Sequence, residues 1–147
     1  MARISLHRAV TGVLGLSVVV AVATVASPAL AATPLPTLKV TPSTKLVNKQ
    51  KVQLTGIGFP ANKPVYAVEC LRTAPNLSGC DVAHSRAFRT TAAGTFPKKF
   101  FFTVHTGTIG KGKSAGSCGT KTTTAKCSIA IASGALSYAG APIVFRG

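Results

Sequence analysis

The sequence predicts an all-β protein: a seven-stranded antiparallel β-sandwich held by two disulfide bonds. After residue 31, no window of ten or more residues keeps the 3.6-residue hydrophobic period of an amphipathic helix. Short segments of alternating apolar and polar residues occur instead, separated by turn clusters rich in glycine and proline. About seven such segments in one small domain are typical of a sandwich of the immunoglobulin type.

The N-terminal segment has the features of a secretory signal peptide. A basic stretch at residues 3–8 precedes an uncharged apolar run at residues 9–26, and a small-x-small cleavage site follows at residues 29–31. We therefore expect a signal peptide at residues 1–31 and a single secreted domain at residues 32–147, which holds 116 of the 147 residues. An uncleaved membrane anchor is the alternative, because the apolar run is just long enough to cross a bilayer.

Alternation of apolar and polar residues places the strands. We expect strands at residues 38–40, 51–55, 65–70, 96–105, 128–132 and 141–145, and residues 82–91 are ambiguous. In the most hydrophobic segment, Phe100, Phe102 and Val104 share one face, while Phe101 lies on the other. Two clusters rich in turn residues, at 56–64 and 107–119, are expected to be loops.

Four cysteines lie in the expected mature domain: Cys70, Cys80, Cys118 and Cys127. An even number of cysteines in an exported chain predicts two disulfides. Three pairings are possible, and we expect Cys70–Cys80 and Cys118–Cys127, which close the smallest loops. A loop of about ten residues closed in this way restricts the unfolded chain by roughly 3 kcal/mol. We expect no metal site, because neither pair has two-residue spacing and the two mature histidines are far apart in sequence.

The charge balance indicates an anionic partner. The chain has a formal net charge of +15, and the domain without the two arginines of the signal peptide keeps +13. Such a charge suits duplex DNA or an anionic wall polymer. We expect the main contacts at Lys111, Lys113 and Lys121, because a glycine-rich loop can follow a phosphate backbone. The alternative is that these lysines only keep an exported protein soluble.

The sequence does not predict an enzyme. Glu69 and Asp81 are the only carboxylates of the mature chain, and nothing in the sequence places them across one cleft. Residues 107–114 match the phosphate-binding loop G-x-x-x-x-G-K-S, and residues 112–116 match the nucleophile elbow G-x-S-x-G. Both motifs require a turn from a strand into a helix, and no helix is expected here. We interpret this segment as a mobile, basic, solvated loop.

Several short segments together resemble the neocarzinostatin family. They are Thr41-Pro42-Ser43, Gly56-Ile57-Gly58, residues 65–70, Cys80 and Gly94. The resemblance covers nearly all of the mature chain. It implies a secreted actinobacterial apoprotein with a seven-stranded immunoglobulin-like sandwich. Members of this family bind an enediyne chromophore in a cleft beside the sandwich and release it to cut DNA, so they are described as antibiotic carriers and DNA-binding proteins.

The resemblance also implies which residues line the ligand cleft: Cys70, Arg72, Cys80, Ser85, Ile109, Ser128 and Ala132. Arg72 and Ser85 stand at positions where the family usually has aromatic side chains. Aromatic walls supply much of the apolar area that holds a flat ligand. Their replacement by arginine and serine removes several kcal/mol of burial by the rough area rule.

These observations predict a binding protein with an altered cleft. We expect a partner of one of two kinds, either a small apolar ligand in the cleft or a polyanion on the basic surface. The second function is that of an envelope-associated or polyanion-binding module without a chromophore. No cofactor is expected beyond a non-covalently held apolar chromophore, and the protein is expected to be a monomer.

Overall fold

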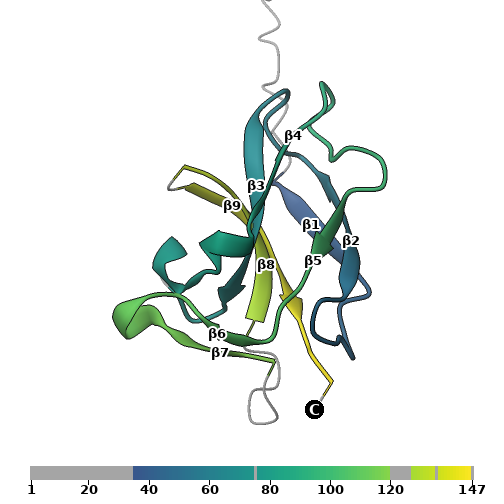
Figure 1. Cartoon of the computed structure of the whole chain (residues 1–147). Coiled ribbons are helices and arrows are strands. Elements are labelled where there is room, and N and C mark those ends of the chain that lie inside the picture. The colour runs from purple at the N-terminus through teal and green to yellow at the C-terminus, as the bar shows by residue number, and fades with distance from the viewer. Residues whose placement is uncertain (1–34, 75, 120–126, 135, 147) are drawn as a thin grey trace, which may run out of the picture. The chain divides into compact units, whose positions relative to one another are not determined.

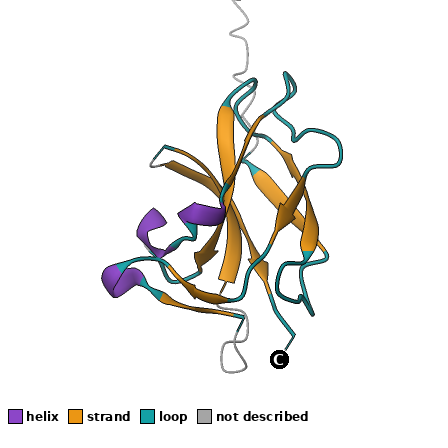
Figure 2. Cartoon of the chain, viewed as in Figure 1, coloured by secondary structure: helices purple, strands orange, loops and turns teal. Residues whose placement is uncertain are grey.

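The computed structural model describes residues 35–74, 76–119, 127–134 and 136–146, and these residues form a β-sandwich (Figures 1 and 2). The nine strands found there are β1 (Thr37–Thr41), β2 (Lys51–Ile57), β3 (Pro64–Leu71), β4 (Arg86–Arg89), β5 (Phe101–Thr103), β6 (Gly107–Ile109), β7 (Gly116–Cys118), β8 (Cys127–Ser133) and β9 (Leu136–Ile143). Three short 3₁₀-helices are η1 (Leu77–Gly79), η2 (Val82–His84) and η3 (Gly112–Ser114). Within this described part of the chain, no helix has the length and apolar character needed to cross a membrane.

The strands form three sheets in which every neighbouring pair is antiparallel. One sheet has the order β1-β2-β5, and the other main sheet has the order β4-β3-β8-β9. Strands β6 and β7 pair only with each other. The two main sheets contain the predicted seven strands. The count of nine arises because the segment predicted to be a loop, residues 107–119, folds into this additional ribbon.

The core lies between the inner faces of the two main sheets. Val52 and Leu54 of β2 and Phe102 of β5 share one buried cluster with Ile129 and Ile131 of β8. Each of these side chains is at most 2% exposed. Burial of such aliphatic and aromatic groups contributes roughly 1.5–3 kcal/mol each. The alternation predicted for residues 51–55 is therefore confirmed.

The most hydrophobic segment is only partly a strand. Phe100, Phe102 and Val104 are buried while Phe101 is 39% exposed, which confirms the predicted faces. The strand itself, however, covers only Phe101–Thr103 of the expected 96–105. Pro97 lacks a backbone N–H, and Lys99 has a left-handed φ of 58°, so residues before 101 do not continue the ladder.

Two glycines allow the aromatic part of the core to close. A Cβ on Gly56 would lie 2.6 Å from the ring of Phe96 and 2.7 Å from the ring of Phe59. Gly56, where the sequence predicted a turn, pairs with Leu38 of β1 within strand β2. Gly94 has a φ of 67°, and a Cβ there would lie 2.2 Å from the carbonyl oxygen of Phe59.

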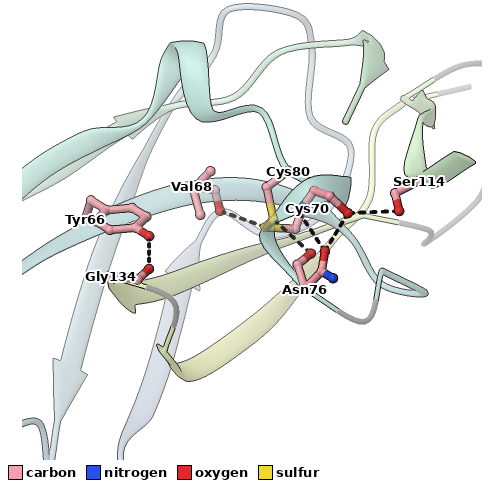
Figure 3. The surroundings of a disulfide bond; sticks show 8 residues. Tyr66, Val68, Cys70, Asn76, Cys80, Ser114 and Gly134 are labelled. Carbon is pink, nitrogen blue, oxygen red and sulfur yellow. Dashed lines mark hydrogen bonds between the residues drawn. A yellow bond between two sulfur atoms is a disulfide. The ribbon is translucent and has the colours of Figure 1, made fainter. Parts of the chain in front are cut away.

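Both disulfides expected from the sequence are present. Cys70 bonds to Cys80 with a Cα–Cα distance of 3.9 Å, and Cys118 bonds to Cys127 with a distance of 5.8 Å. The first bond joins β3 to the segment after η1 (Figure 3). The second joins the β6–β7 ribbon to β8 within the main core, where Cys118 and Cys127 are at most 1% exposed.

Candidate functional site: an apolar cleft and a cluster of titratable groups

The outer face of the four-stranded sheet carries a second apolar cluster. Val68 and Cys70 of β3 point away from the main core and cluster with Ala130 of β8 and with Cys80. In the pairing register Val68 lies opposite Ala130. Although this is the outer face, Val68 is fully buried and Ala130 is only 8% exposed, because Leu77 packs against them. The disulfide therefore holds Leu77 and the η1 segment over the sheet.

Two pockets adjoin this disulfide. The first has a volume of about 260 Å³ and lies between Cys70, Leu77, Cys80 and Ala130. The second has a volume of about 400 Å³ and lies between residues 80–83 and residues 108–111 of the ribbon. Cys80 lines both pockets, whereas Cys70 lines only the first.

Polar contacts fix the walls of these pockets. The side chain of Asn76 accepts a hydrogen bond from the backbone N–H of Ser78 at 2.9 Å and caps η1. The hydroxyl of Ser78 lies 2.9 Å from that of Ser114 on the ribbon, and the N–H of Lys111 donates to the carbonyl of Ser78 at 2.7 Å. On the sheet, the hydroxyl of Tyr66 donates to the carbonyl of Gly134 at 2.5 Å (Figure 3).

The residues assigned to the cleft by resemblance are only partly gathered. Cys70 and Cys80 lie at the pocket floor, and Ser128 and Ala132 lie on the same sheet face, opposite Cys70 and Tyr66. Ile109 lines the second pocket. Arg72 and Ser85 are both exposed and line neither of the two pockets.

Val68, Leu77 and Ala130 were missed by the sequence analysis. Val68 and Ala130 were detectable, because each lies two residues from an assigned outer-face position and side chains of a strand repeat their face every second residue. Leu77 was not detectable from the sequence, because its position over the sheet depends on how the disulfide folds the η1 segment back.

The basic loop does not have the geometry of a nucleotide site. Lys111 and Lys113 are exposed, and their stretch contains only the three-residue η3 before β7 begins. A phosphate-binding loop and a nucleophile elbow both need a longer helix after the strand. The hydroxyl of Ser114 contacts Ser78, as described above. Lys121, the third predicted contact, lies outside the described residues.

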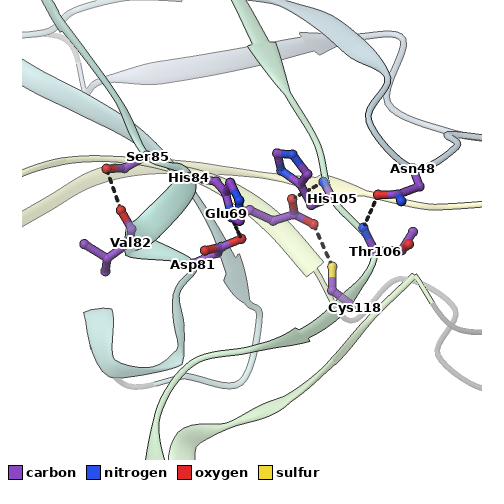
Figure 4. A network of polar contacts seen from close by, with 9 residues as sticks. All are labelled: Asn48, Glu69, Asp81, Val82, His84, Ser85, His105, Thr106 and Cys118. Carbon is purple, nitrogen blue, oxygen red and sulfur yellow. Dashed lines mark hydrogen bonds and ion pairs between the residues drawn. The ribbon is translucent and has the colours of Figure 1, made fainter.

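Figure 4 shows a cluster of titratable groups, one of which, Asp81, also lines the second pocket. It contains both carboxylates and both histidines of residues 32–147: Glu69, Asp81, His84 and His105. A backbone hydrogen bond of 2.8 Å from Asp81 to Glu69 holds the start of η2 beside β3. The two imidazole rings stack with centroids 4.3 Å apart. The two histidines therefore lie together although they are far apart in sequence, and that distance was one of our two reasons to expect no metal site.

Glu69 is an unusual buried carboxyl group. It is 1% exposed on the inner face of β3, and its Oε2 accepts the backbone N–H of His105 at 2.9 Å. Its Oε1 lies 2.8 Å from Sγ of Cys118, which carries no hydrogen because it is in a disulfide. Burial raises the pKa of Glu69 to about 7, and the nearby charge of Asp81 acts in the same direction, while the His105 N–H opposes it. A protonated Glu69 can donate its O–H to that sulfur.

His105 prefers its neutral form. Burial lowers its pKa, and the nearby charges of His84 and Lys49 also lower it, whereas Asp81 raises it. Its Nδ1 atom is buried and has no hydrogen-bond partner within the described part of the chain.

Glu69 does not reach either pocket, so the two carboxylates do not form an acid–base pair across a cleft.

The fold and its cleft define a class: a disulfide-bonded β-sandwich with an apolar pocket on the outer face of its larger sheet. Residues 38–145 match the model of the neocarzinostatin family, and the chain belongs to that family.

Solved structures agree with this fold. Macromomycin is 23% identical, with a TM-score of 0.57, over 75% of this chain and 98% of its own. Apokedarcidin is 22% identical, with a TM-score of 0.50, over 78% of this chain and all of its own. No curated protein sequence matches the chain.

Proposed function

We propose that this protein is a secreted, non-enzymatic carrier that holds a small apolar ligand against the Cys70–Cys80 disulfide. The observation that carries the proposal is the apolar cluster on the outer sheet face, with pockets of about 260 and 400 Å³ that meet at Cys80. Ligand pockets are usually concave, mostly apolar and around 300–1,000 Å³ in volume. Membership of a family whose members carry chromophores supports the same function.

The shape of the pockets indicates the kind of ligand. Small side chains, Ala130 at the first pocket and Ala83 at the second, leave room above the disulfide. Tyr66 is the aromatic residue that packs against this cluster, and Arg72 and Ser85 are exposed. Few stacking surfaces are therefore offered to a flat chromophore. We propose an apolar ligand that is compact rather than extended and polycyclic.

We expect Ala130→Phe to weaken binding of the neutral naphthalene dye prodan. Ala130 lines the first pocket, and a benzyl group there would occupy the space above the disulfide. Ala87→Phe is the matched control, because Ala87 is an exposed residue of β4 that lines neither pocket. Fluorescence titration should show saturable binding to the wild type and to the control, with at least about a tenfold loss for Ala130→Phe, a cost of 1.4 kcal/mol. Equal binding to all three proteins would contradict the proposal.

A second candidate function is the binding of polyanions. It is favoured by the net charge of +13 that remains after removal of the expected signal peptide, and by the exposure of Lys111 and Lys113 on the ribbon. Neither side chain has an ion-pair partner within the described residues, so both ammonium groups are available to phosphate. Attraction of this kind is electrostatic and independent of nucleotide sequence.

A further inference from the structure

The cluster beside the second pocket has the donor set of a metal site. Asp81, His84 and His105 each offer one ligand atom, and these three atoms all lie within 4.8 Å of one another. Asp81 Oδ2 and His84 Nδ1 are already 2.7 Å apart. Bonds of about 2.0–2.1 Å from zinc to nitrogen or oxygen place two tetrahedral ligands roughly 3.3 Å apart. The side chain of His84 is 55% exposed, so it is free to make the small adjustment that remains.

A second observation points to a ligand. The Nδ1 atom of His105 is buried without a hydrogen-bond partner in the described chain, although imidazole nitrogens in proteins are normally satisfied. The backbone of His105 is held in place through its N–H, which donates to Glu69 at 2.9 Å. Its own position is thus fixed by the fold, while one of its ring nitrogens is left for another partner.

The combination of donors selects the kind of ion. Two imidazoles and one carboxylate suit borderline ions such as Zn²⁺, Co²⁺ and Cu²⁺, whereas Mg²⁺ and Ca²⁺ prefer oxygen ligands. The nearby sulfur atoms do not compete, because Cys118 and Cys127 are bonded to each other and neither is a thiolate. A site with three protein ligands leaves one coordination position open.

We propose that Asp81, His84 and His105 bind one divalent transition-metal ion of the zinc type. The site is assembled by three separate parts of the fold. The Cys70–Cys80 bond and the Asp81–Glu69 backbone contact place Asp81, η2 places His84 one turn later, and the chain leaving β5 places His105 against it. The proposal does not require the carrier function, although Asp81 also lines the second pocket.

Calorimetric titration of the untagged, chelator-treated protein with Zn²⁺ tests this site. The expected result is saturable binding of one ion per chain, and Co²⁺ should give visible absorption bands of a coordinated ion. Loss of an outer-shell partner alone typically costs 10- to 100-fold in metal affinity. We therefore expect His84→Ala and His105→Ala each to weaken Zn²⁺ binding about 100-fold or more. Asp81→Asn should weaken it as well.

Two controls separate loss of the metal ligands from loss of folding. His84 is largely exposed, so His84→Ala should melt at the wild-type temperature in the presence of a chelator. Ser117→Ala, at an exposed position of β7 outside the cluster, should bind Zn²⁺ as the wild type does. Absence of saturable Zn²⁺ binding to the wild type would overturn the proposal. Wild-type affinity in a folded His84→Ala or His105→Ala protein would overturn it equally.

Discussion

Raising the salt concentration from about 50 to about 200 mM should weaken binding of duplex DNA roughly 500-fold, if about five phosphates are neutralised. The driving force is release of counterions from the DNA, so log K should fall linearly with log salt at nearly one unit per phosphate. Replacement of Lys111, Lys113 and Lys121 by glutamine should lower this slope by nearly three. Fluorescence anisotropy with a labelled duplex measures both quantities.

A matched variant separates the ribbon from net charge alone. Lys51, Lys63 and Lys98 are exposed and lie outside the ribbon, so their replacement by glutamine removes the same charge elsewhere. We expect the slope of this control to change by less than that of the ribbon variant. Equal changes would show that only the total charge matters. Binding that is undetectable at about 50 mM salt would contradict this function, since non-specific binding is strongest at low salt.

The free energy of unfolding should fall with rising pH by about 3 kcal/mol less in Glu69→Gln than in the wild type. Burial raises the folded-state pKa of Glu69 to about 7 from an ordinary value of 4.5, so folding favours the protonated carboxyl. Below pH 4.5 both states are protonated and the group carries no penalty. As pH rises through the window from 4.5 to 7, the unfolded state loses its proton first and stability falls. Above this window the penalty is constant, at about 3 kcal/mol.

Denaturant unfolding of both proteins between about pH 4 and pH 8, with a chelator present, measures this difference. Glutamine keeps an oxygen that can accept the N–H of His105, but it does not ionise. His105 has a lowered pKa and therefore costs stability as pH falls, yet it is present in both proteins and largely cancels in their difference. Parallel stability curves would show that the carboxyl group of Glu69 ionises as easily in the folded state as in the unfolded state.

The two main sheets were predictable because strand alternation is a local property. Val52 and Leu54 alternate with less buried residues, and this pattern alone places one face of β2 in a core. The β6–β7 ribbon was not predictable in the same way. Its strands are three residues each and rich in glycine, so their pairing depends on the Cys118–Cys127 bond and on the contact with η1 rather than on a hydrophobic period.

The candidate sites also contain features that the sequence could predict and features that it could not. The Cys70–Cys80 bond was predictable, because the two cysteines are close in sequence, whereas their place in a ligand cleft was implied only by the family resemblance. The approach of His84 to His105 is a property of the topology: η2 follows β3 by way of the disulfide, whereas His105 follows β5 of the other sheet. Residues brought together from two sheets have no common pattern in the sequence.

Native mass spectrometry of the protein isolated from its own host tests the carrier function most directly. A non-covalent ligand in the pockets beside Cys70–Cys80 should appear as added mass on the folded chain and should disappear on denaturation. Ala130→Phe produced in the same host should lack this mass, while Ala87→Phe should retain it. The result that would contradict the account is a wild-type protein that carries no ligand, or one whose ligand remains bound in Ala130→Phe.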